Sequence, residues 1–194
     1  TIGGADYLKE HQMIFGNKAY LKEDDNVINH LDYYDISHAR QAYYLSNECG
    51  FPLYDNTSAE YLPSGEKFLS RLLEEMENAK EYIYLEFFIV AEGKMWQQIH
   101  SVLKKKVDEG VEVKLIFDDF GSIKRQRKNF VHNLRREGIS VAVFNPIHPF
   151  MTTFQNNRDH RKIVVIDGLV AFTGGINMNP ADYSDISFQN NGKL

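Results

Sequence analysis

Three features of this 194-residue sequence predict an α/β fold with a mixed, mostly parallel central sheet flanked by helices. From residue 51 onward, segments with strand and helix patterns alternate with short connections, which is typical of parallel strands joined by helices. An Asp-Gly pair between two apolar runs indicates a β-hairpin near the C-terminal end. Hydrophobic residues make up 43% of the chain and charged residues 25%, as in an ordinary globular domain.

The first 50 residues are polar and acidic, and only Asp35–Glu48 has helical character, ended by Gly50 and Pro52. We therefore predict an acidic, partly helical segment over residues 1–50 and a domain over residues 51–194. In that domain Ser64 is the expected N-cap of a helix with an apolar stripe, Phe68, Leu69, Leu72, Leu73 and Met76. Two further helices are expected at Lys94–Glu109 and Ile123–Glu137, each followed by a glycine.

Strands are expected where aromatic and β-branched residues cluster. These segments are Tyr82–Val90, Val111–Phe117, Ile139–Phe144, Lys162–Ile166 and Leu169–Thr173. The last two form the hairpin around Asp167-Gly168, a dipeptide that tolerates positive φ at both turn positions. Both faces of these two strands are apolar, so we expect them to be central in the sheet and covered on each side.

The charge along the chain is uneven. Residues 1–93 hold 7 Lys/Arg against 17 Asp/Glu, whereas residues 94–163 hold 14 against 7. A positive field of this kind attracts anionic lipid headgroups or nucleic acid, and solvated helix faces explain the pattern equally well. The single cysteine, Cys49, excludes a disulfide framework, and no apolar run approaches the roughly 20 residues of a membrane-spanning helix.

Residues before the hairpin turn and after its second strand indicate a site for chemistry. Residues two apart in a strand share a face, so His160 and Lys162 should point the same way. With a two-residue Asp167-Gly168 loop, Ile166 pairs with Leu169, and His160 faces Gly175, which leaves a gap beside the imidazole. Asn177 then has the matching parity on the returning strand.

This combination suits a phosphodiester. A neutral His160 offers a nucleophilic nitrogen, while Lys162 and Asn177 can hold the non-bridging oxygens of a phosphate and the charge that develops on them. Nothing in the set requires a metal or another cofactor. Asp167 can be a catalytic residue or only the turn residue, and both interpretations stay open.

The pattern His160-x-Lys162-x₄-Asp167-x₆-Gly174-Gly175-x-Asn177 resembles the HKD motif of the phospholipase D superfamily at every position. The neighbouring sequence looks like that of bacterial cardiolipin synthases over about residues 50–194. The segments that carry this resemblance include Pro63–Glu66, Glu92–Trp96, Asp118–Ser122, Phe144–Pro146, Arg158–Lys162 and Phe172–Asn177.

The resemblance implies a phospholipase D-type sandwich in which two such motifs form one active site. One histidine becomes a phosphohistidine and the other protonates the leaving alcohol, so that two phosphatidylglycerol molecules give cardiolipin and glycerol without a metal. His160, Lys162 and Asp167 are then the expected catalytic residues, with Gly175 and Asn177 at the phosphate. Expected partners are anionic phospholipid and a second HKD half, in the same chain or in a homodimer. Nucleic acid is not an expected partner.

This sequence differs from the family pattern because it has one motif and no membrane helix. We expect a truncated N-terminal half, inactive alone and itself soluble, of an enzyme at the bacterial cell membrane with its catalytic part on the cytoplasmic side. The alternatives are a homodimeric single-motif phosphodiesterase or nuclease and a non-catalytic phosphate-binding half.

Several neighbouring residues keep two interpretations. Glu86, a lone carboxylate in an apolar strand, can support an imidazole or Arg158, or can lie at an exposed edge. Asp118-Asp119 can suggest Mg²⁺ binding, although the resemblance favours a structural role in ordering a loop. Phe87, Phe88 and Trp96 are expected in the core.

Overall fold

The computed structural model describes residues 36–49, 51, 53–54, 57–147 and 157–179. Contacts divide the chain into two units, Thr1–Glu60 and Tyr61–Leu194, whereas the domain boundary proposed from sequence, between residues 50 and 51, stays a prediction. In the first unit, α3 (Ile36–Tyr43) continues as a π-helical segment, Tyr44–Glu48. The predicted helix is thus confirmed over its described residues; Asp35, Gly50 and Pro52 lie outside them.

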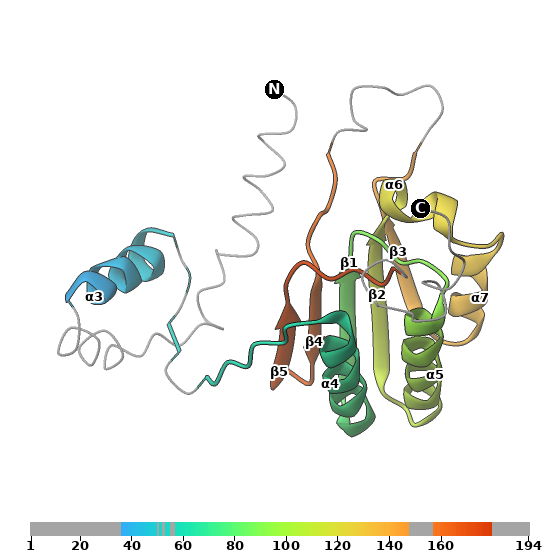
Figure 1. The fold of residues 1–194 in the computed structure, drawn as a ribbon, viewed down its shortest axis with the longest axis horizontal. Coiled ribbons are helices and arrows are strands. Elements are labelled where there is room, and N and C mark those ends of the chain that lie inside the picture. The colour runs from blue at the N-terminus through green and yellow to red at the C-terminus, as the bar shows by residue number, and fades with distance from the viewer. Residues whose placement is uncertain (1–35, 50, 52, 55–56, 148–156, 180–194) are drawn as a thin grey trace, which may run out of the picture. The chain divides into compact units, whose positions relative to one another are not determined.

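The second unit is built on a five-stranded mixed sheet (Figure 1). Its strands are β1 (Tyr82–Phe87), β2 (Glu112–Asp118), β3 (Ser140–Phe144), β4 (Ile163–Ile166) and β5 (Val170–Thr173), in the order β3-β2-β1-β4-β5. β1 pairs in parallel with β2, and β2 with β3, while β4 is antiparallel to both β1 and β5. The predicted α/β class with a mixed sheet is confirmed, and half of the strand pairings are parallel.

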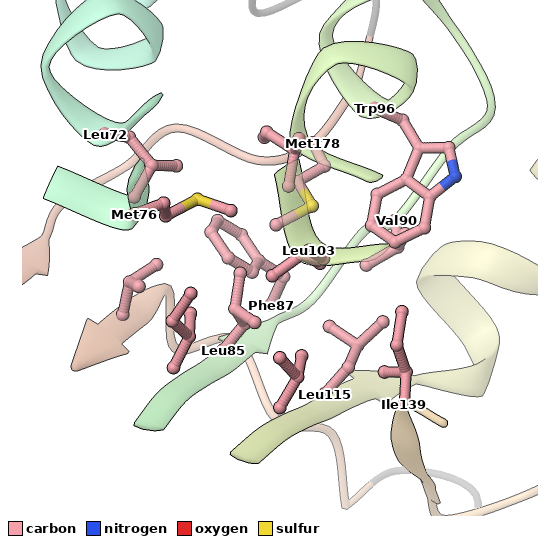
Figure 2. Packing of buried hydrophobic residues seen from close by; sticks show 14 of the residues in the cluster. Leu72, Met76, Leu85, Phe87, Val90, Trp96, Leu103, Leu115, Ile139 and Met178 are labelled. Carbon is pink, nitrogen blue, oxygen red and sulfur yellow. The ribbon is translucent and has the colours of Figure 1, made fainter. Parts of the chain in front are cut away.

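The core lies on one face of this sheet, against α4 (Gly65–Asn78), α5 (Lys94–Asp108) and α7 (Phe130–Arg136). Burial alternates along β1 and β2, so Leu85, Phe87 and Leu115 point into the core that Figure 2 shows. The opposite face of β2 exposes Glu112, Lys114 and Ile116. Within the described residues, the helices therefore cover one face of the sheet. No described helix is long and apolar enough to span a membrane.

Local sequence signals explain most of the helix ends. The Ser64 hydroxyl accepts a hydrogen bond from the Lys67 backbone N–H at 3.3 Å, as predicted for an N-cap. Gly110 and Gly138 follow α5 and α7 with φ of +90° and +86°, a conformation that favours glycine. The Tyr82–Val90 strand prediction was too long, because β1 ends at Phe87.

The predicted continuous helix over Ile123–Glu137 is wrong. The chain instead forms α6 (Asp119–Ser122), a 3₁₀ turn at Ile123–Arg125 (η3) and α7. The Asp118 carboxylate caps the turn directly after β2, so that helical structure begins before residue 123. Asn129 has φ of 69°, in the left-handed region, which cannot continue a right-handed helix.

The β4–β5 hairpin forms, but with a different register from the prediction. Ile166 pairs with Val170 and Ile163 with Thr173, which leaves a three-residue loop, Asp167–Leu169. Asp167 and Gly168 both have positive φ, 52° and 67°, as the sequence indicated. β5 is the last strand in the order given above, and Ala171 and Thr173 are exposed. The expectation that both strands are covered on each side is therefore wrong for β5.

Candidate active site

The candidate site lies where the parallel strands β1, β2 and β3 end. Because β4 is antiparallel to β1 and Glu86 pairs with Ile163, the residues just before β4 lie beside the end of β1. His160 and Lys162 are in this segment, and Phe88 directly follows β1. Ligands of open α/β sheets typically bind at the carboxyl ends of the parallel strands.

His160 and Lys162 both lie against the ring of Phe88. The imidazole and phenyl centroids are 4.9 Å apart, and the Lys162 Nζ is 5.4 Å from the same phenyl centroid. Lys162 is 5% exposed and donates a hydrogen bond from Nζ to the His160 carbonyl, whereas the His160 side chain is exposed. The structure thus brings together the two residues that the sequence paired, with a buried cation next to an accessible imidazole.

A cavity of about 500 Å³ opens at this point. It is lined by Phe144, Arg158, Asp159, His160 and Arg161. The cavity combines an imidazole ring, two guanidinium groups, a carboxylate and an aromatic wall. A tetrahedral, negatively charged phosphorus group suits such a lining, since arginine binds phosphate oxygens well.

Arg158 is held by Asp118, and not by Glu86 as one interpretation of the sequence had it. Its Nη1 donates to the Asp118 Oδ1 at 3.2 Å and to the Asn145 carbonyl at 3.0 Å. The fully buried Asp118 also accepts from the backbone N–H of Asp159 at 3.0 Å and of Phe120 at 2.8 Å. Asp118 and Arg158 together therefore join the ends of β2 and β3 to the segment that carries His160.

This arrangement matches the loop-ordering role expected for Asp118-Asp119 better than a magnesium site. Asp119 accepts a hydrogen bond from the Ile147 backbone N–H at 2.8 Å, and Asp118 already faces Arg158. Across the described residues, no cluster of three or more His, Cys, Asp or Glu side chains could hold a metal ion.

Glu86 pairs with Arg161, a partner that the sequence interpretation did not propose. The Glu86 Oε1 lies 2.7 Å from the Arg161 Nη2, and Arg161 also binds both carboxylate oxygens of Asp159 at 3.0 and 3.1 Å. Burial, followed by the hydrogen bond to the Asp159 carboxyl, raises the pKa of Glu86 to about 7. Burial also acts to raise the Asp159 pKa, but the bonds from Arg161 and Glu86 outweigh it and lower that pKa to about 2. Near neutral pH, Glu86 therefore takes up a proton while Asp159 stays ionised.

Asp167 lies at the other end of β4 from His160 and Lys162. Its carboxylate accepts hydrogen bonds from the backbone N–H groups of Lys80, Glu81 and Tyr82 at 2.7, 2.9 and 2.7 Å. Burial acts to raise the pKa of Asp167, and these three donors together lower it below its ordinary value. Asp167 therefore fixes the start of β1 to the hairpin turn, and the structure does not bring it to the other proposed catalytic residues.

Gly175 and Asn177 do not lie on the returning strand, as the sequence had predicted, but follow its end. β5 ends at Thr173, and the observed register moves Gly175 away from the position opposite His160, so that prediction is wrong. A Cβ added at Gly175 would meet no atom within 4 Å. Asn177 is 8% exposed, and its Oδ1 accepts from the Ile89 backbone N–H at 3.0 Å, one residue after Phe88. Phosphate contact by Gly175 and Asn177 stays a prediction.

Three site residues were missed in the sequence: Phe88, Asp159 and Arg161. Phe88 was assigned to the core because it lies in an aromatic run, but it is half-buried and follows the strand. Asp159 and Arg161 flank His160 directly. Their alternation with His160 and Lys162 could have indicated this pairing. An acidic and a basic residue two positions apart share the side of an extended chain that lies opposite to His160 and Lys162.

The fold and this histidine–lysine site define a phospholipase D-like domain. Residues 72–187 match the family model described as "Cardiolipin synthase, PLD-like domain". The chain therefore belongs to the cardiolipin synthase branch of phospholipase D-like domains.

The curated relatives include proteins named cardiolipin synthase and one uncharacterized protein. The chain is 42% identical over 164 residues to an uncharacterized protein of Streptococcus mutans, covering 83% of the chain and 35% of that protein. Cardiolipin synthase of Geobacillus sp. is 36% identical over 73% of the chain and 28% of its own length. Cardiolipin synthase 1 of Staphylococcus epidermidis is 32% identical over 89% of the chain and 34% of its own length. The chain thus spans about a third of the length of these relatives.

Two solved structures are also similar. NucT from Helicobacter pylori aligns with a TM-score of 0.47 and 15% identity, over 62% of this chain and 72% of that one. Nuc from Salmonella typhimurium, a phospholipase D family member, aligns with a TM-score of 0.45 and 19% identity, over 60% and 68% of the two chains.

Proposed function

We propose that this chain supplies one half of a phosphatidyl-transfer site that makes cardiolipin and glycerol from two phosphatidylglycerol molecules. The observation that carries the proposal is the exposed His160 ring at the mouth of a cavity, with the buried Lys162 ammonium against the same phenyl ring. An accessible imidazole beside a fixed cation suits nucleophilic attack on an anionic phosphodiester. The relatedness to cardiolipin synthases supports phosphatidylglycerol as the diester.

In the proposed first step, a His160 ring nitrogen attacks phosphorus. A P–N bond forms, the P–O bond to the glycerol headgroup breaks, and the departing oxygen takes a proton from an acid on the other side of phosphorus. In the second step a hydroxyl of another phosphatidylglycerol attacks, its proton returns to that same group, and the P–N bond breaks. Lys162 and Arg158 offset the negative charge on the non-bridging oxygens in both steps.

The acid must come from outside the described site. One imidazole cannot attack phosphorus and protonate the group that leaves on the opposite side in the same step. We propose that a second HKD half, in the same polypeptide or in a second copy of the chain, supplies it. Membrane attachment at the cytoplasmic side of a bacterial membrane is part of this proposal.

An activated diester tests the nucleophile without the second half. A p-nitrophenyl leaving group needs little protonation, so an aryl phosphodiester should phosphorylate the chain alone, and mass spectrometry should place an acid-labile, alkali-stable phosphoryl adduct on His160. His160→Ala should abolish the adduct, and His132→Ala, which removes an exposed imidazole of α7, should keep it. An adduct that persists in His160→Ala would contradict the proposal. If a dimer of the chain cleaved DNA and did not turn over lipid, the nuclease alternative would be favoured.

A further inference from the structure

The corner formed by residues 119–128, which comprises α6, η3 and the turn after it, carries large apolar side chains on the surface. Phe120 is 63% exposed and Ile123 is 49% exposed. Exposed basic residues follow in the same turn of chain: Lys124, Arg125, Arg127 and Lys128. Asp119 is the one acidic residue in the corner, and its carboxylate faces the Ile147 backbone N–H.

The outer and inner sides of this corner differ in chemistry. Phe120, Ile123 and Lys124 are spaced i, i+3 and i+4, so that they neighbour one another on the outside of a helical turn. Gly121 and Ser122 are buried on the inside. An aromatic ring and an aliphatic side chain next to cationic groups are typical of elements that lie in the interface of an anionic membrane.

The inner side is bound firmly to the loop that holds the candidate active site. The Ser122 hydroxyl donates to the Phe88 carbonyl at 3.3 Å and accepts from the Val90 backbone N–H at 3.0 Å. Gly121 lies so close that an added Cβ would be 2.3 Å from the Phe88 carbonyl oxygen. The corner therefore has little freedom to move relative to Phe88, which contacts His160.

The outer side also reaches the cavity directly. The guanidinium carbon of Arg158, a cavity residue, lies 5.5 Å from the centre of the Phe120 ring. Farther along, the Arg127 backbone N–H donates to the Glu92 carboxylate at 2.7 Å, and the Gln126 amide donates to the Val90 carbonyl at 3.1 Å. A partner surface that bound Phe120 would therefore lie next to the cavity, with only the Arg158 side chain between them.

We propose that this corner docks onto an anionic phospholipid bilayer, with Phe120 and Ile123 entering the interface and the neighbouring basic side chains facing lipid phosphates. The inference rests on the proposed function, because it delivers the lipid substrate to His160. Charge complementarity favours an anionic partner. The exposed aliphatic Ile123 favours a bilayer over a nucleic acid, because phosphate and sugar contacts use polar groups and bases stack on planar rings.

Vesicle binding by the 194-residue chain tests the proposal. The chain should co-sediment with vesicles of equimolar phosphatidylcholine and phosphatidylglycerol far better than with phosphatidylcholine alone, and less as salt rises. Each Lys near such a surface contributes about a fivefold factor in partition, so Lys124→Glu/Lys128→Glu should weaken binding by at least about 25-fold. Phe120→Ser should weaken it about tenfold, the low end for burying a Phe side chain.

A charge-matched variant controls for net charge and for other parts of the chain. Lys80→Glu/Lys104→Glu makes the same change at exposed positions, before β1 and on the later part of α5, and should bind vesicles like the unchanged chain. Equal losses in the two double variants would overturn the proposal. So would binding to single-stranded DNA that is tighter than to the vesicles at the same salt and is lost in Lys124→Glu/Lys128→Glu.

The same variants separate this inference from the proposed function. His160→Ala should bind vesicles normally and form no adduct with the water-soluble aryl phosphodiester. Lys124→Glu/Lys128→Glu should form the adduct at the normal rate and fail to bind vesicles. Adduct formation without any preference for phosphatidylglycerol vesicles would leave the nucleophile in place and refute the docking surface.

Discussion

The Glu86 Oε1 lies 2.7 Å from the Arg161 Nη2, and the same guanidinium group holds Asp159 on the opposite flank of His160. A carboxyl from β1 thereby fixes the backbone on either side of the proposed nucleophile. The pKa of Glu86 is raised to about 7, first by burial and then by the neighbouring Asp159, so Glu86 takes up a proton near neutral pH. Glu86 is thus a candidate positioning residue that would act on His160 through Arg161 and Asp159.

The raised pKa of Glu86 predicts a pH dependence of stability. Between its ordinary value of 4.5 and about 7, Glu86 binds a proton in the folded chain but not in the unfolded one. The free energy of unfolding should therefore fall as the pH rises through this window. Replacing Glu86 with Gln should remove that slope, because Gln does not titrate. The slope should amount to only about 1 kcal/mol between about pH 5 and pH 8, because partial exposure to solvent screens the pair.

Urea unfolding of the unchanged chain and of Glu86→Gln at several pH values measures the slope. Glu112→Gln is a suitable control on the same sheet, since hydrogen bonds, that from Lys114 first, lower the pKa of Glu112 and keep its titration below this window. A Glu86→Gln variant with the same pH slope as the unchanged chain would mean that the pKa of Glu86 is not raised in the folded chain.

Asp167 is predicted to contribute stability and no chemistry. Its carboxylate accepts three backbone N–H groups, and Asp167→Asn removes the charge and part of this acceptor capacity while still tolerating the positive φ. The variant should lose about 1–3 kcal/mol of folding free energy. Under conditions where it stays folded, it should form the His160 adduct at the normal rate. A normal stability with a lost adduct would instead give Asp167 a catalytic role.

The position of Asp167 shows how far the sequence alone could predict this site. The motif spacing correctly placed His160 and Lys162 together, because both precede one strand at fixed spacing. The predicted hairpin already put Asp167 in the turn at the far end of that strand. Spacing could not show that its carboxylate binds the backbone of Lys80–Tyr82, since those partners lie far away in sequence. Asp-Gly correctly predicted a hairpin, but Leu169 is part of the loop, which has three residues and not the two expected, and the register is shifted by one residue. Parity arguments for Gly175 and Asn177 failed with it.

The helices show the same limit. Ser64, Gly110 and Gly138 act locally, so their roles were predictable. Helical structure begins before the predicted third helix because the Asp118 carboxylate caps α6 while also binding Arg158 and the Asp159 backbone N–H. Such long-range polar contacts are invisible to periodicity, and they are what assembles the ends of β2 and β3 into the site.

Two glycines, Gly121 and Gly175, should differ in how much stability they lose when replaced by alanine. A Cβ at Gly121 would lie 2.3 Å from the Phe88 carbonyl oxygen, so Gly121→Ala must displace the loop that contacts His160. We expect a loss of about 1–3 kcal/mol in stability and slower adduct formation. Gly175→Ala meets no atom within 4 Å and should fold normally. Thermal unfolding of both variants tests the contrast, and equal stability of Gly121→Ala and the unchanged chain would contradict it.

Transfer at His160 is predicted not to need a divalent metal. The buried carboxylate of Asp118, which the sequence offered as a possible Mg²⁺ ligand, already faces Arg158 and two backbone N–H groups. Adduct formation from the aryl phosphodiester should therefore be the same with excess chelator as with added Mg²⁺. A chelator-sensitive reaction that Mg²⁺ restores would require a metal-assisted mechanism in its place.

The chain alone is predicted to bind phosphate and to fail at turnover of phosphatidylglycerol. In-line displacement needs a nucleophile on one side of phosphorus and a proton donor on the other, and His160 can fill only one position. General acid catalysis is worth about 10²–10⁴ in rate, and a missing second cation costs about 10²–10³ more. An aryl diester escapes the first loss because its leaving group is already a weak base, so the chain should show the adduct without phosphatidyl transfer.

Turnover measured together with the oligomeric state decides between the two ways of completing the site. Robust phosphatidylglycerol turnover by a monomer would refute the half-site interpretation. Turnover that rises with dimer formation and is absent in His160→Ala would favour a two-fold dimer, because an isologous interface can bring two copies of His160 together. Mixing the unchanged chain with His160→Ala separates these cases further. In a dimer that needs both rings, the inactive variant should lower turnover more steeply than simple dilution does, whereas an active monomer should lose activity only in proportion.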